Sequence, residues 1–139
     1  MIESRTSIKV PFQDVDMFSI VWHGNYARYL EMARCELLEL IGYTYLDMKA
    51  SGYVFPIVDL KLRYARPIEF NQQIVVIARL KEWQNWIRIN YEIVDEDTGK
   101  RLAKAVTRQV AVRLECRTLL NESPQILLDK VHYALATHR

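Results

Sequence analysis

The chain has 139 residues, with 19 lysines and arginines against 17 aspartates and glutamates, and a formal net charge of +2. We expect residues 1–139 to form a single domain that is long enough to bury its own core. The small charge argues against a nucleic-acid or membrane-surface partner, and no apolar run approaches the ~20 residues of a membrane span.

The chain begins without the apolar segment typical of a secretory signal, and we expect none. Its two cysteines, Cys35 and Cys116, are far apart and have no metal-ligand spacing. We interpret them as buried or half-buried free thiols in a reducing compartment. These features together predict a cytoplasmic protein.

The first part of the chain predicts one strand and one long helix. Alternating apolar residues predict a strand over residues 4–12, and an acidic turn follows. Over residues 25–41, apolar side chains recur at offsets of three and four, which gives a helix one apolar face. Gly42 is a typical helix stop, and residues 45–50 add a short helical turn. The predicted apolar face consists of Tyr26, Tyr29, Leu30, Ala33, Leu37, Leu40 and Ile41.

From residue 53 onwards the pattern changes to a period of two, which predicts β-strands. Residues 97–100, Asp-Thr-Gly-Lys, are a hairpin turn signal. A C-terminal amphipathic helix is predicted to begin at Ser123-Pro124. One long helix against an antiparallel sheet of about five strands makes an α+β two-layer domain. The strands after the long helix are predicted over residues 53–64, 74–83, 86–93 and 102–114.

Residues 12–26 gather two acids, a histidine and an Asn-Tyr pair in a turn directly before the long helix. A carboxylate beside a helix N-terminus suits attack on a carbonyl, because the acid can act as nucleophile or as base. The unpaired amides at the helix start can hold the oxyanion that develops. The pattern therefore predicts an active site here.

This run, with Asp14-Val15-Asp16, then residues 20–23, Ile-Val-Trp-His, and Asn25-Tyr26, resembles the 4-hydroxybenzoyl-CoA thioesterase family and the related acyl-CoA thioesterase associated with the Tol-Pal system. The likeness covers roughly residues 5–120. It implies the hotdog fold, a long central helix wrapped by a curved antiparallel sheet. It also implies hydrolysis of acyl-CoA or acyl-carrier-protein thioesters without metal or organic cofactor, in homodimers or homotetramers with sites at the dimer interface.

The resemblance places the catalytic carboxylate on Asp16 and an active-site histidine on His23. Asp16 would act as nucleophile, giving a mixed anhydride, or as general base on water, and both remain open. The alternative is a turn or capping aspartate. His23 would orient the carbonyl, hold water or supply its backbone amide, and simple packing at the helix start is its alternative. We interpret Asp14 as fixing the shape of the turn.

The chain departs from the family at Met17-Phe18-Ser19, where members usually carry a glycine-containing stretch. Glycine would let the backbone turn freely or approach the substrate. Phe18 would either narrow the acyl pocket or pack in the core. This departure supports an alternative function, in which a hotdog protein binds an acyl group or a carrier protein without turning it over.

Four further residues, Trp22, Tyr26, Phe55 and Val58, are predicted to contact substrate, with packing in the core or an interface as the alternative. Basic side chains along the strands would meet CoA phosphates or an acidic carrier protein, or would simply form solvated strand faces. These basic residues are Arg63, Arg66, Arg79, Lys81 and Arg88.

The sequence lacks the motifs of other enzyme chemistries. The chain has no Gly-rich phosphate loop and no Gly-x-Ser-x-Gly elbow. His23, His132 and His138 have no helical ligand spacing, so we expect no metal site. A hotdog dehydratase, which pairs histidine with an acid from a longer-range motif, is a further alternative whose motif is missing.

Overall fold

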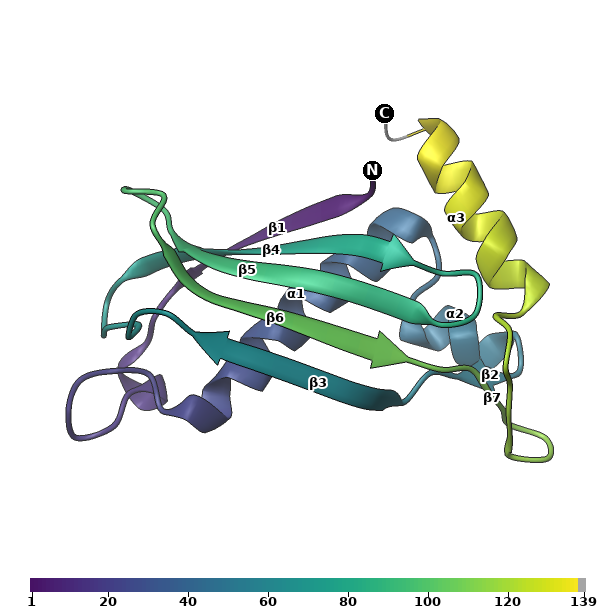
Figure 1. The fold of residues 1–139 in the computed structure, drawn as a ribbon, viewed down its shortest axis with the longest axis horizontal. Helices are drawn as coiled ribbons and strands as arrows, with labels where there is room; N and C mark the ends of the chain where they lie inside the picture. The colour runs from purple at the N-terminus through teal and green to yellow at the C-terminus, as the bar shows by residue number, and fades with distance from the viewer. Residues whose placement is uncertain (138–139) are drawn as a thin grey trace.

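The computed structural model describes residues 1–137 and shows one long helix lying against a curved antiparallel sheet (Figure 1). The helix, α1, spans Tyr26–Ile41, and the strand order in the sheet is β1-β4-β5-β6-β3. The predicted α+β two-layer architecture is therefore confirmed. The five strands are β1 (Glu3–Lys9), β3 (Ile57–Tyr64), β4 (Gln73–Glu82), β5 (Ile87–Asp95) and β6 (Arg101–Gln109).

Helix α1 forms where the periodicity predicts it and ends at Gly42, which has φ 78° and donates its amide to the carbonyl of Glu39 at 3.0 Å. The prediction that Leu40 faces inward is wrong, because Leu40 is exposed and Leu38 is buried instead. The buried side chains recur as neighbouring pairs every four residues, and Leu40 falls outside that stripe. The buried residues of α1 are Tyr26, Tyr29, Leu30, Ala33, Arg34, Leu37, Leu38 and Ile41.

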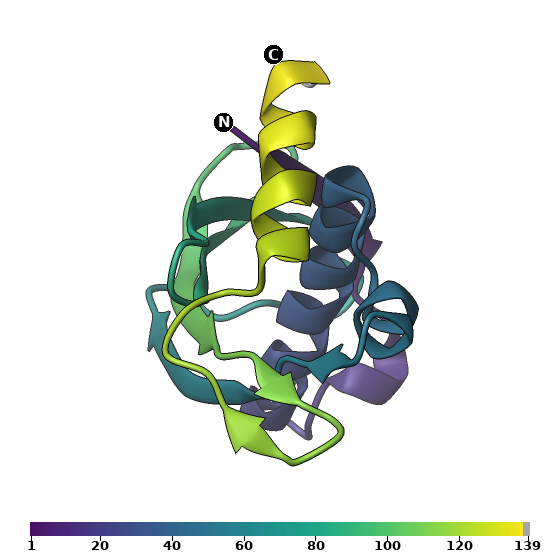
Figure 2. The same ribbon diagram turned by 90° about the vertical axis from the view of Figure 1, so that its right-hand side faces the viewer.

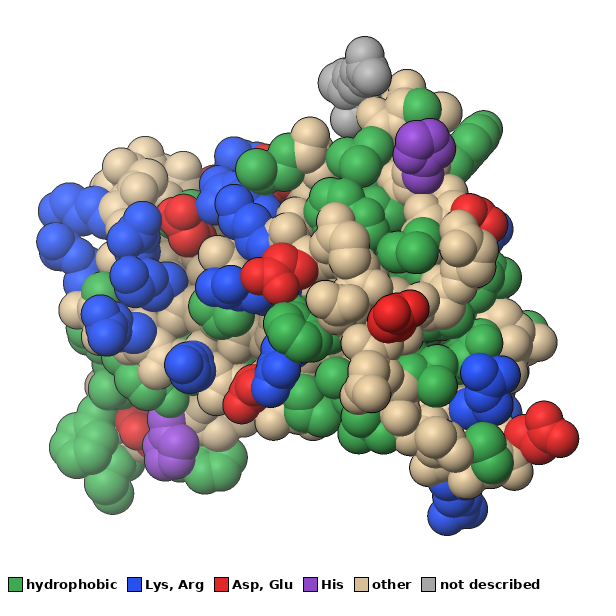
Figure 3. All heavy atoms as spheres, turned by 45° about the vertical axis from the view of Figure 1, so that its right-hand side comes forward, with side chains coloured by type: hydrophobic (Ala, Val, Ile, Leu, Met, Phe, Trp, Pro, Cys, Tyr) green, Lys and Arg blue, Asp and Glu red, His purple; other side chains and the backbone are tan. Residues whose placement is uncertain are grey.

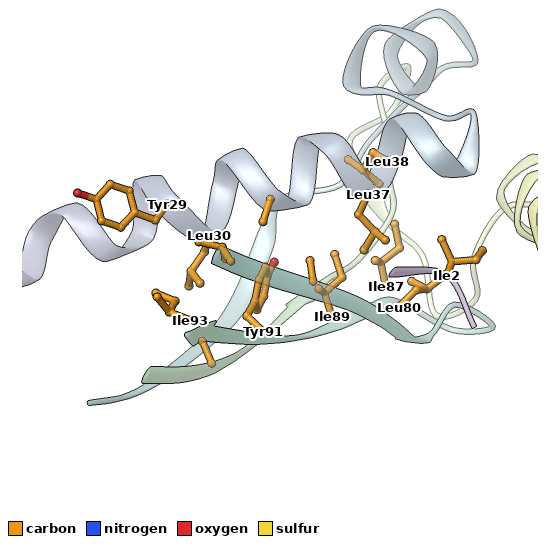
Figure 4. Close-up of a cluster of buried hydrophobic side chains, with 14 of the residues drawn as sticks. Ile2, Tyr29, Leu30, Leu37, Leu38, Leu80, Ile87, Ile89, Tyr91 and Ile93 are labelled. Atoms are coloured by element: carbon orange, nitrogen blue, oxygen red, sulfur yellow. The ribbon is translucent and has the colours of Figure 1, made fainter. Parts of the chain in front are cut away.

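The core fills the space between α1 and the inner face of the sheet (Figure 4). Alternate residues of β5 point toward the helix, where they meet Leu30 and Leu37. Each fully buried aliphatic side chain contributes roughly 1.5–3 kcal/mol relative to leaving it in water. The inward residues of β4 and β5 are Ile74, Val76, Ala78, Leu80, Ile87, Ile89, Tyr91 and Ile93.

Two predicted strands are shorter than expected. The strand predicted over residues 53–64 is interrupted at Phe55-Pro56, because proline cannot donate to a ladder. The strand predicted over residues 102–114 ends as β6 at Gln109, and the chain then leaves the main sheet. The separated pieces, β2 (Tyr53–Val54) and β7 (Val112–Arg113), form a small second sheet with β8 (Thr118–Leu119).

Two further expectations are corrected. Strand β1 ends at Lys9, two residues before Pro11, and Phe12 starts the 3-10 turn η1 (Phe12–Asp14) with its ring exposed. The two cysteines, Cys35 and Cys116, are exposed rather than buried or half-buried. Cys35 lies outside the buried stripe of α1 and therefore faces solvent.

Two shorter helices complete the fold. Helix α2 (Tyr45–Ala50) starts with a capping box, in which Thr44 and Asp47 each accept the other's backbone amide. Helix α3 (Gln125–Thr137) follows Pro124, as predicted, and packs against the end of the sheet and of α1 (Figure 2). No helix among residues 1–137 is both long and apolar enough to cross a membrane.

Candidate active site

The buried carboxylate of Asp14 ties the acidic loop to the start of α1. The Tyr29 hydroxyl donates to Asp14 Oδ2 at 2.6 Å, and the Arg28 guanidinium donates to Oδ1. The Asp14 carbonyl accepts the Asn25 side-chain amide at 2.9 Å and the Trp22 backbone amide at 3.0 Å. Burial, followed by the hydrogen bond to Asp14, raises the pKa of Tyr29. These contacts agree with the interpretation that Asp14 fixes the shape of the turn.

Asp16 sits in a tight turn at the centre of this loop. Its carbonyl accepts the Ser19 amide at 3.0 Å, and its amide donates to the Ile20 carbonyl at 2.9 Å. The Phe18 amide donates to Asp16 Oδ1 at 2.9 Å. Within residues 1–137, Asp16 Oδ2 has no hydrogen-bond partner. One carboxylate oxygen therefore holds the turn, and the other is available to a substrate or water.

The structure explains the departure at Met17-Phe18-Ser19. Ser19 has φ 61°, the left-handed conformation that glycine adopts at no steric cost. Met17 and Phe18 project from the turn and are 89% and 75% exposed. Phe18 is therefore neither packed in the core nor in contact with the pocket of its own chain.

Helix α1 is preceded by one 3-10 turn, η2 (His23–Asn25). The Asn25 amide donates to the Trp22 carbonyl at 2.9 Å, whereas no backbone acceptor within residues 1–137 is paired with the amides of His23 and Gly24. The Trp22 ring packs on Gly24, where a Cβ would come within 2.2 Å of it. The positive end of the helix dipole and two free amides therefore meet at His23 and Gly24.

An open pocket of ≈ 370 Å³ joins this helix start to Asp16. Tyr26 forms one wall, and its ring meets that of Tyr64 edge-on at 4.8 Å. Burial raises the pKa of Tyr26 above its usual value of 10.0. The pocket is lined by Asp16, Ile20, Val21, His23, Tyr26, Tyr64, Ala65, Arg66 and Pro67.

The structure thus brings together Asp16, His23 and Tyr26 of the predicted site residues. Trp22 lies beside the helix start, half exposed, but is not among the residues that line the pocket. Phe55 is buried against Tyr43, with ring centroids 6.1 Å apart, and Val58 is exposed on β3. These two residues do not reach the pocket of their own chain.

The sequence does not predict Tyr64 as a site residue. It predicts Arg66 only as a contact for CoA phosphates or a carrier protein. Tyr64 and Arg66 reach the pocket because β3 pairs with β6, and this pairing places the end of β3 beside the start of α1. The alternation of β3 assigns Tyr64 to the same face as Leu62 and Leu60, which is the only sequence signal for it. Among residues 1–137 there is no group of three or more metal-ligating side chains.

Comparison with known proteins gives consistent matches. A family model described as the thioesterase-like superfamily matches residues 10–131. A candidate esterase of Synechocystis, sll0410, is 34% identical over 124 residues, 88% of this chain and 74% of that protein. A candidate acyl-CoA thioesterase of Bacillus subtilis (strain 168), YneP, is 26% identical over 112 residues, 81% of each chain.

Among solved structures, the DHNA-CoA thioesterase of Staphylococcus aureus superposes with a TM-score of 0.83 at 24% identity. The superposition covers 99% of this chain and 91% of that one. At this level of identity the likeness concerns the fold, and it confirms the predicted hotdog architecture.

Proposed function

Because the chain belongs to the thioesterase-like superfamily and is a thioester hydrolase, we propose that the Asp16–His23 pocket is its active site and that Asp16 is the catalytic carboxylate. One observation carries this proposal. Asp16, whose Oδ2 has no partner within residues 1–137, lines the same pocket as the free start of the helix at His23. The acyl group, on CoA or on a carrier protein, would be cleaved from its thiol there.

The helix start stabilises the charge that develops on the thioester oxygen. As a nucleophile adds to the carbonyl carbon, its oxygen becomes an oxyanion, and amide donors aimed at that position lower the barrier. The amides of His23 and Gly24, with the helix dipole behind them, supply such donors. Loss of one such donor typically costs about 10²–10³ in kcat.

Asp16 has two routes to the same products. As nucleophile, its carboxylate adds to the carbonyl carbon and expels the thiolate, leaving a mixed anhydride that water then hydrolyses. As general base, it takes a proton from water, whose oxygen adds to the carbonyl carbon before the thiolate leaves. Both routes consume one water and release one acid and one thiol.

Thiol release from aromatic and C2–C16 acyl-CoAs, and from acyl-carrier-protein, tests the proposal. We expect Asp16→Asn, which preserves shape, to lower kcat by about two or more orders of magnitude. The matched control is Asp97→Asn, an exposed turn aspartate that does not line the pocket, which should leave kcat unchanged. An acyl group that stays on the protein after acid quench would identify the nucleophilic route.

Two results would count against this proposal. Unchanged turnover in Asp16→Asn would mean that another group performs the chemistry. A wild-type protein that releases no thiol from CoA or carrier-protein thioesters, yet is stabilised by them against melting, would favour the alternative of acyl binding without turnover.

We also propose that the chain works as a homodimer joined through β3. This strand is one of the two edges of the main sheet, and its outer backbone groups have no strand partner within residues 1–137. Antiparallel pairing with β3 of a second copy would bring the Ile57 end of one strand beside the Tyr64 end of the other. The exposed Val58 would then approach the partner's pocket, which supports its predicted role in substrate binding, whereas Phe55 stays buried in its own chain. The exposed apolar side chains of β3 are Ile57, Val58, Leu60 and Tyr64.

A cytoplasmic location remains our proposal for where this enzyme works. Its support comes from the thiols of Cys35 and Cys116, which are free and exposed. Free thiols persist in reducing compartments, whereas oxidising ones pair or modify them. The thioester substrates of the proposed reaction are themselves thiol derivatives, so product thiol would also persist there.

A further inference from the structure

The outer face of the sheet, opposite α1, carries a dense group of cations. An open hollow of ≈ 560 Å³ on this face is lined by six cationic side chains and one carboxylate, that of Glu92. In Figure 3, most of the visible Lys and Arg side chains lie on the left side of the view. The six cations are Lys61, Arg63, Arg79, Lys81, Arg101 and Lys104.

Two of the six cations are already paired. Arg79 donates to Glu3 at 2.7 Å and to Glu92 at 2.9 Å, and Arg101 lies 3.6 Å from Glu92. The other four make no ion pair within 4 Å among residues 1–137, although Glu92 lies directly across from Lys104 in the register of the sheet. We name these four, Lys61, Arg63, Lys81 and Lys104, the basic outer face.

The register of the sheet explains why these charges lie together. Lys61 and Arg63 are two residues apart on β3 and therefore share a face, and Lys104 of β6 pairs directly with Arg63. Lys81 lies on β4, three strands away from β3 in the order β4-β5-β6-β3. At about 4.8 Å per strand, the basic outer face is about 14 Å wide.

The basic outer face and the proposed active site both include residues from the end of β3. Arg63 lines the outer hollow, whereas its neighbour Tyr64 lines the pocket that holds Asp16. Arg66, two residues further on, also lines this pocket and has no carboxylate within 4 Å among the described residues. Arg63 on the outer face and Arg66 at the pocket are therefore only three residues apart along the chain.

Charge and width indicate what covers this face. A second copy in a two-fold contact would place like charges opposite one another, which is unfavourable. One phosphate or diphosphate group is only a few ångströms across, so it would leave part of a face about 14 Å wide unpaired. An acidic protein helix, about 10–12 Å in diameter with its side chains, matches this width and charge.

We propose that the basic outer face docks an acidic acyl carrier protein, so that its thioester-bearing arm enters the pocket past Arg66. This proposal rests on the proposed function, because it names the macromolecule that presents the thioester. The docking contacts lie outside the pocket, so they act on association with the carrier and leave the chemical step unchanged.

The experiment compares one acyl group on two thiols, octanoyl-acyl-carrier-protein and octanoyl-CoA. The test variant combines Lys81→Glu and Lys104→Glu, two exposed side chains of the basic outer face that lie on β4 and β6 and not on the β3 edge of the proposed dimer. The control variant makes the same charge change elsewhere, with Lys49→Glu and Lys130→Glu. Carrier affinity is measured in parallel by fluorescence anisotropy of labelled octanoyl-acyl-carrier-protein, at low and at raised salt.

We expect the test variant to raise KM for octanoyl-acyl-carrier-protein by about tenfold or more with kcat unchanged, and to move KM for octanoyl-CoA by less than about twofold. Anisotropy should show the same loss, and salt should weaken the wild type more than the variant. Parallel increases for both substrates would mean a site for CoA phosphates and would overturn the proposal, as would no change in either.

Failure of the proposed function is distinguishable from failure of docking. If the wild type cleaved neither substrate, anisotropy would still report binding of the carrier. Binding lost in the test variant but kept in the control variant would support docking without hydrolysis. No binding by the wild type would overturn the docking proposal.

Discussion

The hydroxyl of Tyr29 donates a 2.6 Å hydrogen bond to the carboxylate of Asp14, which is only 3% exposed. Tyr29 belongs to α1 and Asp14 to the loop before it, so this bond joins the rigid helix to the segment that carries Asp16. Arg28 binds the other carboxylate oxygen from the same helix. The position of the proposed catalytic residue therefore depends on a carboxylate that does not line the pocket.

Tyr29→Phe should destabilise the fold more than removal of an ordinary tyrosine hydroxyl. It leaves a buried, charged acceptor with one donor fewer, which costs about 1.5–3 kcal/mol in the free energy of unfolding. The control is Tyr43→Phe, another fully buried tyrosine, whose hydroxyl bonds the neutral Ser51 hydroxyl at 2.6 Å and whose loss should cost about 1 kcal/mol. Urea unfolding measures both, and equal losses would contradict a special role for the Asp14 bond.

Stability should fall at alkaline pH. Burial raises the pKa of Tyr26, Tyr29, Tyr43 and Tyr91 above the usual value of 10.0. Above about pH 10 these phenols ionise in the unfolded chain but stay protonated in the folded one. The unfolded state then binds fewer protons, so the free energy of unfolding is fully present below pH 10 and decreases as pH rises, by up to about 1.4 kcal/mol per pH unit for each tyrosine.

Urea unfolding between pH 8 and pH 11 measures this slope, and Tyr29→Phe is the informative comparison. Phenylalanine does not ionise, so the variant should lose less stability per pH unit than the wild type. Lysines titrate in the same range in both proteins and cancel in the difference. Identical slopes would mean that Tyr29 ionises equally well in the folded state.

The elements predicted from local patterns are the ones that the structure confirms. The apolar stripe of α1 and the alternation of β5 repeat over several turns or residue pairs. A single exceptional residue therefore does not hide either pattern. Errors occur where one residue overrides the pattern. Pro56 interrupts a strand, and Leu40 is apolar but lies on the solvent side of its helix.

One part of the candidate site could likewise be predicted from the sequence, and the other part could not. Asp16 and His23 lie seven positions apart in one loop, so their proximity follows from the local chain. Tyr64 and Arg66 join them only because β3 pairs with β6, which no local pattern states. Phe55 and Val58 were predicted through a family resemblance, and a single chain leaves them away from the pocket. The role of Val58 depends on how two copies meet.

Ser19→Gly should stabilise the protein without loss of activity. Ser19 has φ 61°, which is unfavourable for a residue with a Cβ, and glycine removes that cost at the price of a more flexible unfolded chain. We expect a net gain of about 0.5–1 kcal/mol in the free energy of unfolding. The control is Ser7→Gly in the extended strand β1, which should lose about 0.5–1 kcal/mol. A loss in Ser19→Gly as large as in Ser7→Gly would contradict strain at this turn.

Leu60→Lys should separate the proposed dimer. Leu60 is 47% exposed on the edge strand β3, and it faces the same side as Thr107, its pairing partner in the buried face of β6. A partner strand would bury it, so a charge there would oppose association.

Light scattering should give twice the chain mass for the wild type and the single-chain mass for the variant. The variant should also lose turnover, because Val58 of a partner no longer approaches the pocket. The matched control, Leu46→Lys on α2, replaces a leucine that is 80% exposed and lies away from this edge, and it should remain dimeric and active. A fully active single chain of the wild type would contradict the dimer, and a dimeric Leu60→Lys variant would place the interface elsewhere.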